Sequence, residues 1–128
     1  MKMLKNVLLI NALTSGATGL LLTIFPSAIA DIFGHSQSIP FTAVGIFLAI
    51  FAGIVYLQSR KTQVSKNWLK LIIALDMLWV IESVVIIAAQ MFGFTMIGYL
   101  LIAAVAAWVG LMAFLQIRGL RTISLHVA

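Results

Sequence analysis

Two acidic side chains, Asp76 and Glu82, lie within one long apolar stretch of the sequence. A carboxyl group at bilayer depth costs at least a few kcal/mol, so it normally faces a protein interior, a partner or water. On a helix that turns by about 100° per residue, the polar residues of this stretch other than the membrane-edge Lys70 share one arc of about 120°: Asp76, Trp79, Glu82, Ser83 and Gln90. This arc predicts a polar face that points into a helical bundle.

The first apolar stretch carries a matching stripe of uncharged polar side chains: Asn11, Thr14, Ser15 and Thr18. Counted along each helix at about 1.5 Å per residue, Asn11 and Asp76 lie at similar depths, and so do Thr18 and Glu82. We therefore expect the first and third stretches to face each other through a polar seam, in which Asn11 can hydrogen-bond with Asp76. The candidate intramembrane polar site consists of Asn11, Asp76, Trp79 and Glu82.

The two acidic residues allow a structural and a functional interpretation. In the structural one, protonated or hydrogen-bonded carboxyls hold helices together. In the functional one, the pair binds a cation, a proton or the polar head of a small ligand. No Lys or Arg lies at matching depth, because Lys70 is near the edge of its stretch and can extend to the surface. The missing cation slightly favours the functional interpretation.

Other chemistry finds little support. The chain has no cysteine, and its two histidines, His35 and His126, lie outside the apolar stretches, which argues against a bound haem. No phosphate-binding loop or hydrolase motif occurs. We therefore predict no catalytic residue, no metal site and no cofactor, and a protein that is not an enzyme.

The composition of the chain predicts the helices that hold these polar residues in place. The chain has 128 residues, of which 63% are hydrophobic and only 9% charged, whereas soluble domains average about 25% charged residues. Four apolar runs, at about 6–26, 39–58, 68–90 and 95–117, are each long enough to cross a bilayer. Short connections make neighbouring spans antiparallel. The sequence predicts one all-α transmembrane domain over residues 1–128, an up-down four-helix bundle.

All eight basic residues fall on one side of this arrangement: Lys2, Lys5, Arg60, Lys61, Lys66, Lys70, Arg118 and Arg121. The positive-inside rule then places both termini and the 59–67 loop in the cytoplasm. The net charge of +5 reflects topology, so the expected surroundings are the lipid bilayer, with a possible homo-oligomer or membrane-protein partner and no nucleic acid.

The segment after the first span has two interpretations. Residues 28–30, Ala-Ile-Ala, resemble a signal-peptide cleavage site, but the length and the polar stripe of the first run favour a retained span. Pro26 can begin a short helix, in which Ile29, Ile32 and Phe33 share one face and which Gly34 can end. We expect this helix to lie at the outer interface of the membrane.

Small residues predict where helices approach closely. Gly45, Ala49 and Gly53 recur every four residues in the second span, and the first span carries Ser15 and Gly19. The fourth span carries a similar stripe: Ala103, Ala106, Ala107, Gly110 and Ala113. We interpret these residues as packing positions, with the polar atoms carried mainly by the first and third spans.

Three stretches resemble a family of small bacterial four-helix membrane proteins: residues 11–26 (Asn-Ala-Leu-Thr-Ser-Gly to Phe-Pro), residues 74–80 (Ala-Leu-Asp-Met-Leu-Trp-Val) and residues 115–121 (Leu-Gln-Ile-Arg-Gly-Leu-Arg). The resemblance covers nearly the whole chain and implies no particular activity. Small multidrug resistance exporters are similar in length, but they carry their functional glutamate in the first span, where this chain has no acidic residue.

These observations favour a non-enzymatic membrane protein that binds a small molecule, a lipid or a membrane partner through the polar seam. The alternative is a proton- or cation-coupled small transporter that acts as an oligomer. An enzyme acting on a lipid or quinone ranks third.

Overall fold

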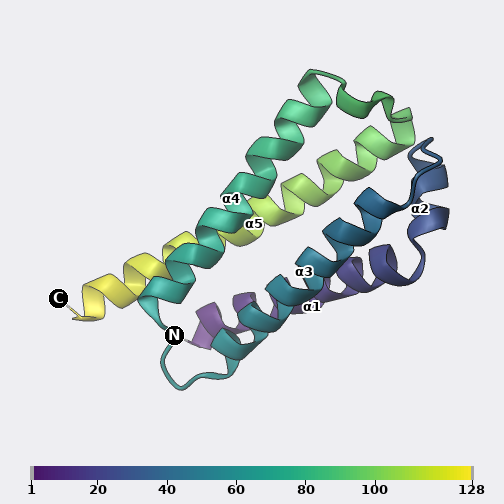
Figure 1. The fold of residues 1–128 in the computed structure, drawn as a ribbon. Helices are drawn as coiled ribbons and strands as arrows, with labels where there is room; N and C mark the ends of the chain where they lie inside the picture. The colour runs from purple at the N-terminus through teal and green to yellow at the C-terminus, as the bar shows by residue number, and fades with distance from the viewer. Residues whose placement is uncertain (1, 128) are drawn as a thin grey trace.

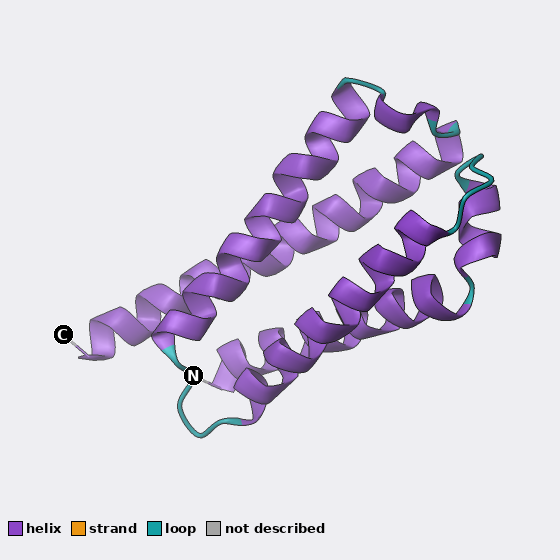
Figure 2. Ribbon diagram, in the orientation of Figure 1, coloured by secondary structure: helices purple, strands orange, loops and turns teal. Residues whose placement is uncertain are grey.

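The computed structural model describes residues 2–127, and every regular element in that range is helical (Figure 1; Figure 2). Four helices are long and two elements are short. In chain order they are α1 (Lys2–Ile24), α2 (Pro26–Ile32), α3 (Ile39–Arg60), α4 (Lys66–Ala88), the 3-10 turn η1 (Met91–Gly93) and α5 (Met96–Val127).

The four long helices correspond to the four predicted spans. Each has at least 22 residues, so each extends at least about 33 Å, enough to cross the hydrocarbon layer. All four are apolar enough to span a membrane, which makes the chain a multi-pass helical membrane protein. The largest difference is in α5, which continues to Val127 instead of ending near residue 117. Charged residues there end the apolar run but do not break the helix.

Successive long helices run antiparallel. Figure 1 shows both ends of the chain and the loop between α3 and α4 at the same end of the bundle. The eight basic residues named above therefore gather at this end, which we call the basic end. The opposite end carries α2, η1 and the loops around them, and residues 26–38 and 89–95 there hold no Lys or Arg.

Helix α1 packs mainly along α3, and α4 packs mainly along α5, while α1 also contacts α5. A Cβ added to Gly19 of α1 would lie 2.8 Å from the carbonyl oxygen of Gly45 and 2.8 Å from the amide nitrogen of Ala49 in α3. This close crossing confirms the predicted packing role of these small residues. Gly53 differs, because a Cβ there would meet nothing within 4 Å.

The apolar core lies in the half of the bundle nearest the basic end. Its buried members come from α1, α3, α4 and the α3–α4 loop: Leu4, Leu8, Ala12, Phe51, Val55, Val64, Leu69, Ile72 and Ile73. Partly buried Ile117 and Leu120 of α5 complete the cluster. All four long helices are therefore joined tightly at this end.

At the opposite end, α2 confirms the short helix predicted after the first span. Pro26 opens it, and Gly34 follows it with a φ of +80°, a conformation that glycine adopts without strain. The backbone amide of Thr95 donates to the carbonyl of Phe33 at 3.1 Å, and the Thr95 hydroxyl donates to the carbonyl of Ile32 at 2.7 Å. These bonds tie the α2 segment to the start of α5.

Candidate functional site

Three polar side chains meet inside the bundle, one from each of α1, α4 and α5. Asn11, Asp76 and Gln116 are 1%, 3% and 0% exposed, respectively. A buried carboxyl and two buried amides would each be costly without hydrogen-bond partners. We call this group the buried triad.

The three side chains of the triad hydrogen-bond to one another. The Nδ2 group of Asn11 donates to Oδ2 of Asp76 at 3.1 Å and to Oε1 of Gln116 at 2.8 Å. The Nε2 group of Gln116 donates to the same Oδ2 atom at 2.8 Å. The Ser15 hydroxyl donates to Oδ1 of Asn11 at 3.1 Å. One carboxyl oxygen thus accepts two amide donors, which stabilises it without a nearby cation.

The predicted contact between Asn11 and Asp76 is present, but the predicted arrangement of their helices is wrong. Among the described helices, α1 lies against α3 and α5, and α4 lies against α5. Helices α1 and α4 share no extended contact, so they do not form a two-helix seam. The bond between Asn11 and Asp76 spans the bundle, and Gln116 of α5 completes the connection.

Gln116 is the site residue that the sequence analysis missed. It lies next to the predicted end of the fourth span, where a polar side chain normally reaches the membrane surface. Two signals could have identified it. Gln116 stands only two positions before Arg118, but its side chain leans toward the N-terminus of its helix, away from the basic end and toward the depth of Asn11. The Asp76 carboxyl also requires hydrogen-bond donors at that depth, and the side-chain amide of Gln116 is such a donor.

The structure does not bring Glu82 to the triad, and the predicted inward orientation of its side chain is wrong. Its side chain is exposed on the outside of the bundle, whereas Asp76 and Ser83 on the same helix are buried. Glu82 lies about 120° around the helix from Asp76, which exceeds the width of the face that α4 buries. Thr18, expected at the same depth, donates its hydroxyl to the carbonyl of Thr14 at 2.8 Å instead.

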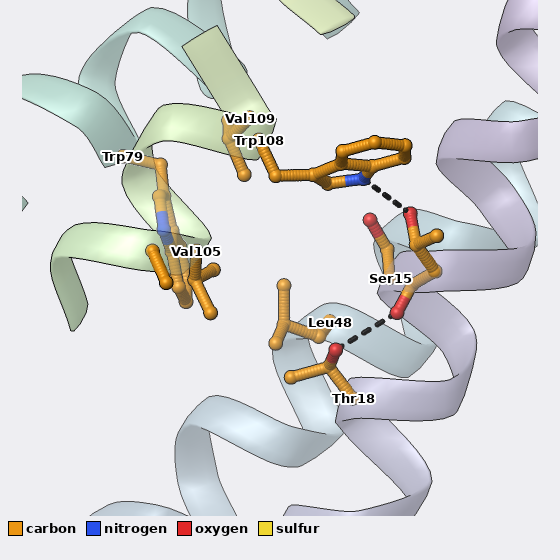
Figure 3. Close-up of a pocket in the computed structure, with 9 residues that line it drawn as sticks. Ser15, Thr18, Leu48, Trp79, Val105, Trp108 and Val109 are labelled. Carbon is orange, nitrogen blue, oxygen red and sulfur yellow. Dashed lines mark hydrogen bonds between the residues drawn. The ribbon is translucent and has the colours of Figure 1, made fainter. Parts of the chain in front are cut away.

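A cavity of about 420 Å³ lies at the middle of the bundle and is lined by all four long helices (Figure 3). Helix α1 contributes three hydroxyl residues, α3 contributes Leu48, and α5 contributes apolar residues and an indole: Thr14, Ser15, Thr18, Leu48, Val105 and Trp108. The Nε1 group of Trp108 donates to the Thr14 hydroxyl at 3.1 Å. Figure 3 shows Trp79 of α4 across the cavity from these hydroxyls.

A second, smaller void of about 20 Å³ lies between this cavity and the triad. Asp76 lines it, and both spaces share four lining residues: Ser15, Leu48, Trp79 and Val109. A space of this size holds about one water molecule. The buried Nε1 group of Trp79 has no hydrogen-bond acceptor among the described residues. The predicted site residue Trp79 therefore stands where the apolar cavity and the triad meet.

Comparison of the chain with protein-family models, with curated proteins and with solved structures finds no match. The geometry still defines a class of protein. The chain is a multi-pass helical membrane protein with a central cavity and a buried hydrogen-bonded triad beside it. The walls of that cavity are therefore the features that bear on its function.

Proposed function

We propose that this protein is a non-enzymatic membrane protein that binds a neutral, mostly apolar small molecule or lipid between its four long helices. The observation that carries this proposal is the central cavity of about 420 Å³. Small-molecule sites usually measure about 300–1,000 Å³ and are mostly apolar, with a few polar groups that orient the ligand. The cavity has this size and this composition.

The cavity walls indicate the class of ligand. Aliphatic and indole surfaces dominate, and the hydroxyls of Thr14, Ser15 and Thr18 form one polar strip. Among the residues that the structure describes, no Lys, Arg or His lines the cavity, so the charge of an anionic head group would be left unpaired at this depth, which is costly. The walls therefore suit an apolar body that carries a hydroxyl or carbonyl group.

The same walls argue against catalysis. Nucleophilic hydroxyls need a base within hydrogen-bond reach. The Ser15 hydroxyl donates to the amide oxygen of Asn11, and the Thr14 hydroxyl donates to backbone carbonyls of α1. Within the described part of the chain, neither hydroxyl is bonded to a histidine, a lysine or a carboxylate, so the cavity supplies hydrogen bonds for orientation rather than an activated nucleophile.

Two neighbouring alanines of α5 provide a matched test of ligand binding. Ala104 lines the cavity and Ala103 does not, although both are exposed. We expect Ala104→Trp to lower the amount of ligand that co-purifies in mild detergent by at least about tenfold, because the indole occupies the cavity. Ala103→Trp should leave that amount unchanged. The measurement is mass spectrometry of the organic extract, normalised to folded protein, and equal ligand in both variants would contradict the proposal.

We further propose that the bundle lies in a bacterial cytoplasmic membrane with its basic end in the cytoplasm. The gathering of eight basic residues at one end supports this orientation. Ser36 and Thr62 are exposed in loops at opposite ends. With cysteine placed at either position, a membrane-impermeant maleimide should label Ser36→Cys in intact cells. Thr62→Cys should react only after permeabilisation, and the reverse pattern would invert the topology.

One observation favours a second candidate function, a proton- or cation-coupled transporter that acts as an oligomer. The small void places the Asp76 carboxyl beside the cavity instead of sealing it within the apolar core. Transport would require an ionisable group at this position, whereas ligand binding would tolerate an amide. The two functions therefore differ in what they demand of Asp76.

A further inference from the structure

The small void beside the central cavity is lined by three polar side chains in an otherwise apolar wall. It measures about 20 Å³, which is room for about one water molecule. Ser15 and Trp79 line both the void and the cavity, and Asp76 of the triad lines the void alone. The hydrogen-bonding state of these three side chains decides which polar group the void can accept.

The hydroxyl of Ser15 presents an acceptor to this void. Both amide hydrogens of Asn11 point to acceptors of the triad, Oδ2 of Asp76 and Oε1 of Gln116. The Oδ1 atom of Asn11 is therefore the one that faces Ser15, and it accepts the Ser15 hydrogen with the two oxygens 3.1 Å apart. Rotation of that hydrogen toward the void would deprive a buried oxygen of its donor, which is costly. Ser15 therefore offers only oxygen lone pairs to the void.

Trp79 presents the opposite group, a donor. Its Nε1 group is buried, and no described residue accepts its hydrogen. Because a buried donor without an acceptor is costly, a bound molecule that supplies one is favoured. The Asp76 carboxyl accepts hydrogens from Asn11 and Gln116 through its Oδ2 atom. The void is therefore lined by acceptors from Ser15 and Asp76 and by one donor from Trp79.

We propose that the small void receives the hydroxyl group of the ligand, so that the protein selects neutral apolar alcohols, an assignment that rests on the proposed function because the central cavity holds the apolar body. A hydroxyl oxygen is comparable to water in size and both donates and accepts, so it can donate to Ser15 and accept from Trp79. A carbonyl oxygen can accept from Trp79, but it has no hydrogen for Ser15 and meets its lone pairs. The void therefore distinguishes an alcohol from a ketone of the same shape.

Menthol, menthone and menthane test this selection, because they share one ring skeleton and carry a hydroxyl, a carbonyl or neither. Binding to the full chain in mild detergent is followed by tryptophan fluorescence, since Trp79 and Trp108 both line the cavity. Each dissociation constant is corrected for partition of the probe into protein-free micelles. We expect menthol to bind at least about tenfold more tightly than menthone, because a polar site rejects an analogue that leaves its buried groups unpaired.

Two substitutions test the named partners in protein whose folding is checked by circular dichroism. Ser15→Ala removes the acceptor, so menthol should lose about tenfold in affinity while menthone does not weaken. The preference for menthol should therefore disappear. Trp79→Phe removes the donor, so menthol and menthone should both weaken relative to menthane. A preference for menthol that persists in Ser15→Ala would overturn the assignment.

Two hydroxyl residues outside the void provide comparisons. Thr18 lines the cavity but not the void, so Thr18→Val should leave the ratio of the menthol and menthone constants unchanged. Ser59 is a buried serine of α3 that lines neither space, and its hydroxyl donates to the carbonyl of Tyr56 on its own helix at 2.6 Å. Ser59→Ala should change neither constant. A preference lost in Thr18→Val but not in Ser15→Ala would place the ligand hydroxyl outside the void.

The possible outcomes separate alcohol selection from ligand binding itself. A preference for menthol that requires Ser15 supports the assignment of the void. Equal affinities for menthol and menthone in the wild-type protein overturn that assignment, while binding of all three probes still supports the central cavity as a ligand site. Failure of every probe to bind would overturn the proposed function and alcohol selection together.

Discussion

Gly45→Ala is expected to destabilise the bundle strongly, because α1 and α3 touch at this point without intervening side chains. A Cβ at position 45 would lie 2.7 Å from the Thr23 hydroxyl oxygen, 2.8 Å from Cβ of Leu22 and 2.9 Å from the carbonyl oxygen of Gly19. The Gly19 oxygen belongs to the backbone, and the Leu22 Cβ is attached directly to it, so neither atom can rotate away. A methyl group at Gly45 therefore has to push the two helices apart.

The size of the effect follows from what must move. Overpacking a tight contact costs about 1–3 kcal/mol when neighbours can shift, and the helix backbones here resist shifting. We expect Gly45→Ala to lower the free energy of unfolding by at least about 2 kcal/mol. Gly19→Ala should act similarly, since its Cβ would lie 2.8 Å from backbone atoms of both Gly45 and Ala49.

Gly53 is the matched control on the same helix. A Cβ there would meet no atom within 4 Å, so Gly53→Ala adds only helix propensity and should stabilise α3 by up to about 1 kcal/mol. Thermal unfolding in one detergent, followed by circular dichroism, compares the variants directly. A Gly45→Ala protein that melts with the wild type would show that the crossing is looser than the structure indicates.

Much of this fold could be predicted from run length and charge. Four apolar runs of sufficient length fix the number of spans, and the basic residues fix which loops share an end. Pro26 and Gly34 marked the short helix α2, because proline favours the start of a helix and glycine accepts the conformation that ends it. Each of these signals is local, so no knowledge of neighbouring helices was needed.

The errors concern which helices are neighbours. Helical periodicity gives the angle of a side chain around its own helix, but it does not say which angles face protein and which face lipid. Asp76 and Glu82 lie about 120° apart, and only the packing of α5 against α4 decides that Asp76 is buried and Glu82 exposed. In a membrane both environments are apolar, so hydrophobicity does not distinguish the two faces.

The candidate site likewise has one part that the sequence predicts and another that depends on how the helices pack. The bond between Asn11 and Asp76 could be predicted from polarity and depth, two properties that the sequence contains. The third member, Gln116, depended on α5 lying against both partners. The cavity had no local signal at all, because it forms where side chains of four helices fail to meet. Its existence is a property of the assembled bundle.

Removal of the Asp76 carboxyl from the buried triad is the second change that we expect to lower stability strongly. In Asp76→Leu, the Nε2 group of Gln116 loses the carboxyl oxygen that accepts its hydrogen, and the Nδ2 group of Asn11 keeps only its bond to Gln116. A buried donor left without an acceptor costs about 1–3 kcal/mol. We expect Asp76→Leu to lower the free energy of unfolding by about that amount, measured by thermal or denaturant unfolding in detergent. Asp76→Asn should cost less than about 1 kcal/mol, because its carbonyl oxygen can accept both hydrogen bonds.

Ser83 supplies the matched control for this comparison. It is another buried polar residue of α4, but its hydroxyl donates only to the carbonyl of Trp79 on its own helix, at 2.7 Å. Ser83→Ala breaks no hydrogen bond between the described helices and should change stability little. A double-mutant cycle on Asn11→Ala and Asp76→Ala should give a coupling of about 0.5–3 kcal/mol. Additive losses would mean that the bond between these two side chains contributes no stability.

Asp76→Asn also separates the two candidate functions, because it preserves the hydrogen bonds of the triad while removing the ionisable group. If the protein only binds a neutral ligand, the variant should keep its co-purified ligand and its stability. If the protein transports protons or cations, the variant should stay folded but lose substrate-dependent proton flux in liposomes, since its amide cannot carry the proton or the charge. Unchanged flux would exclude Asp76 as the coupling residue and leave the triad as a structural junction beside the cavity.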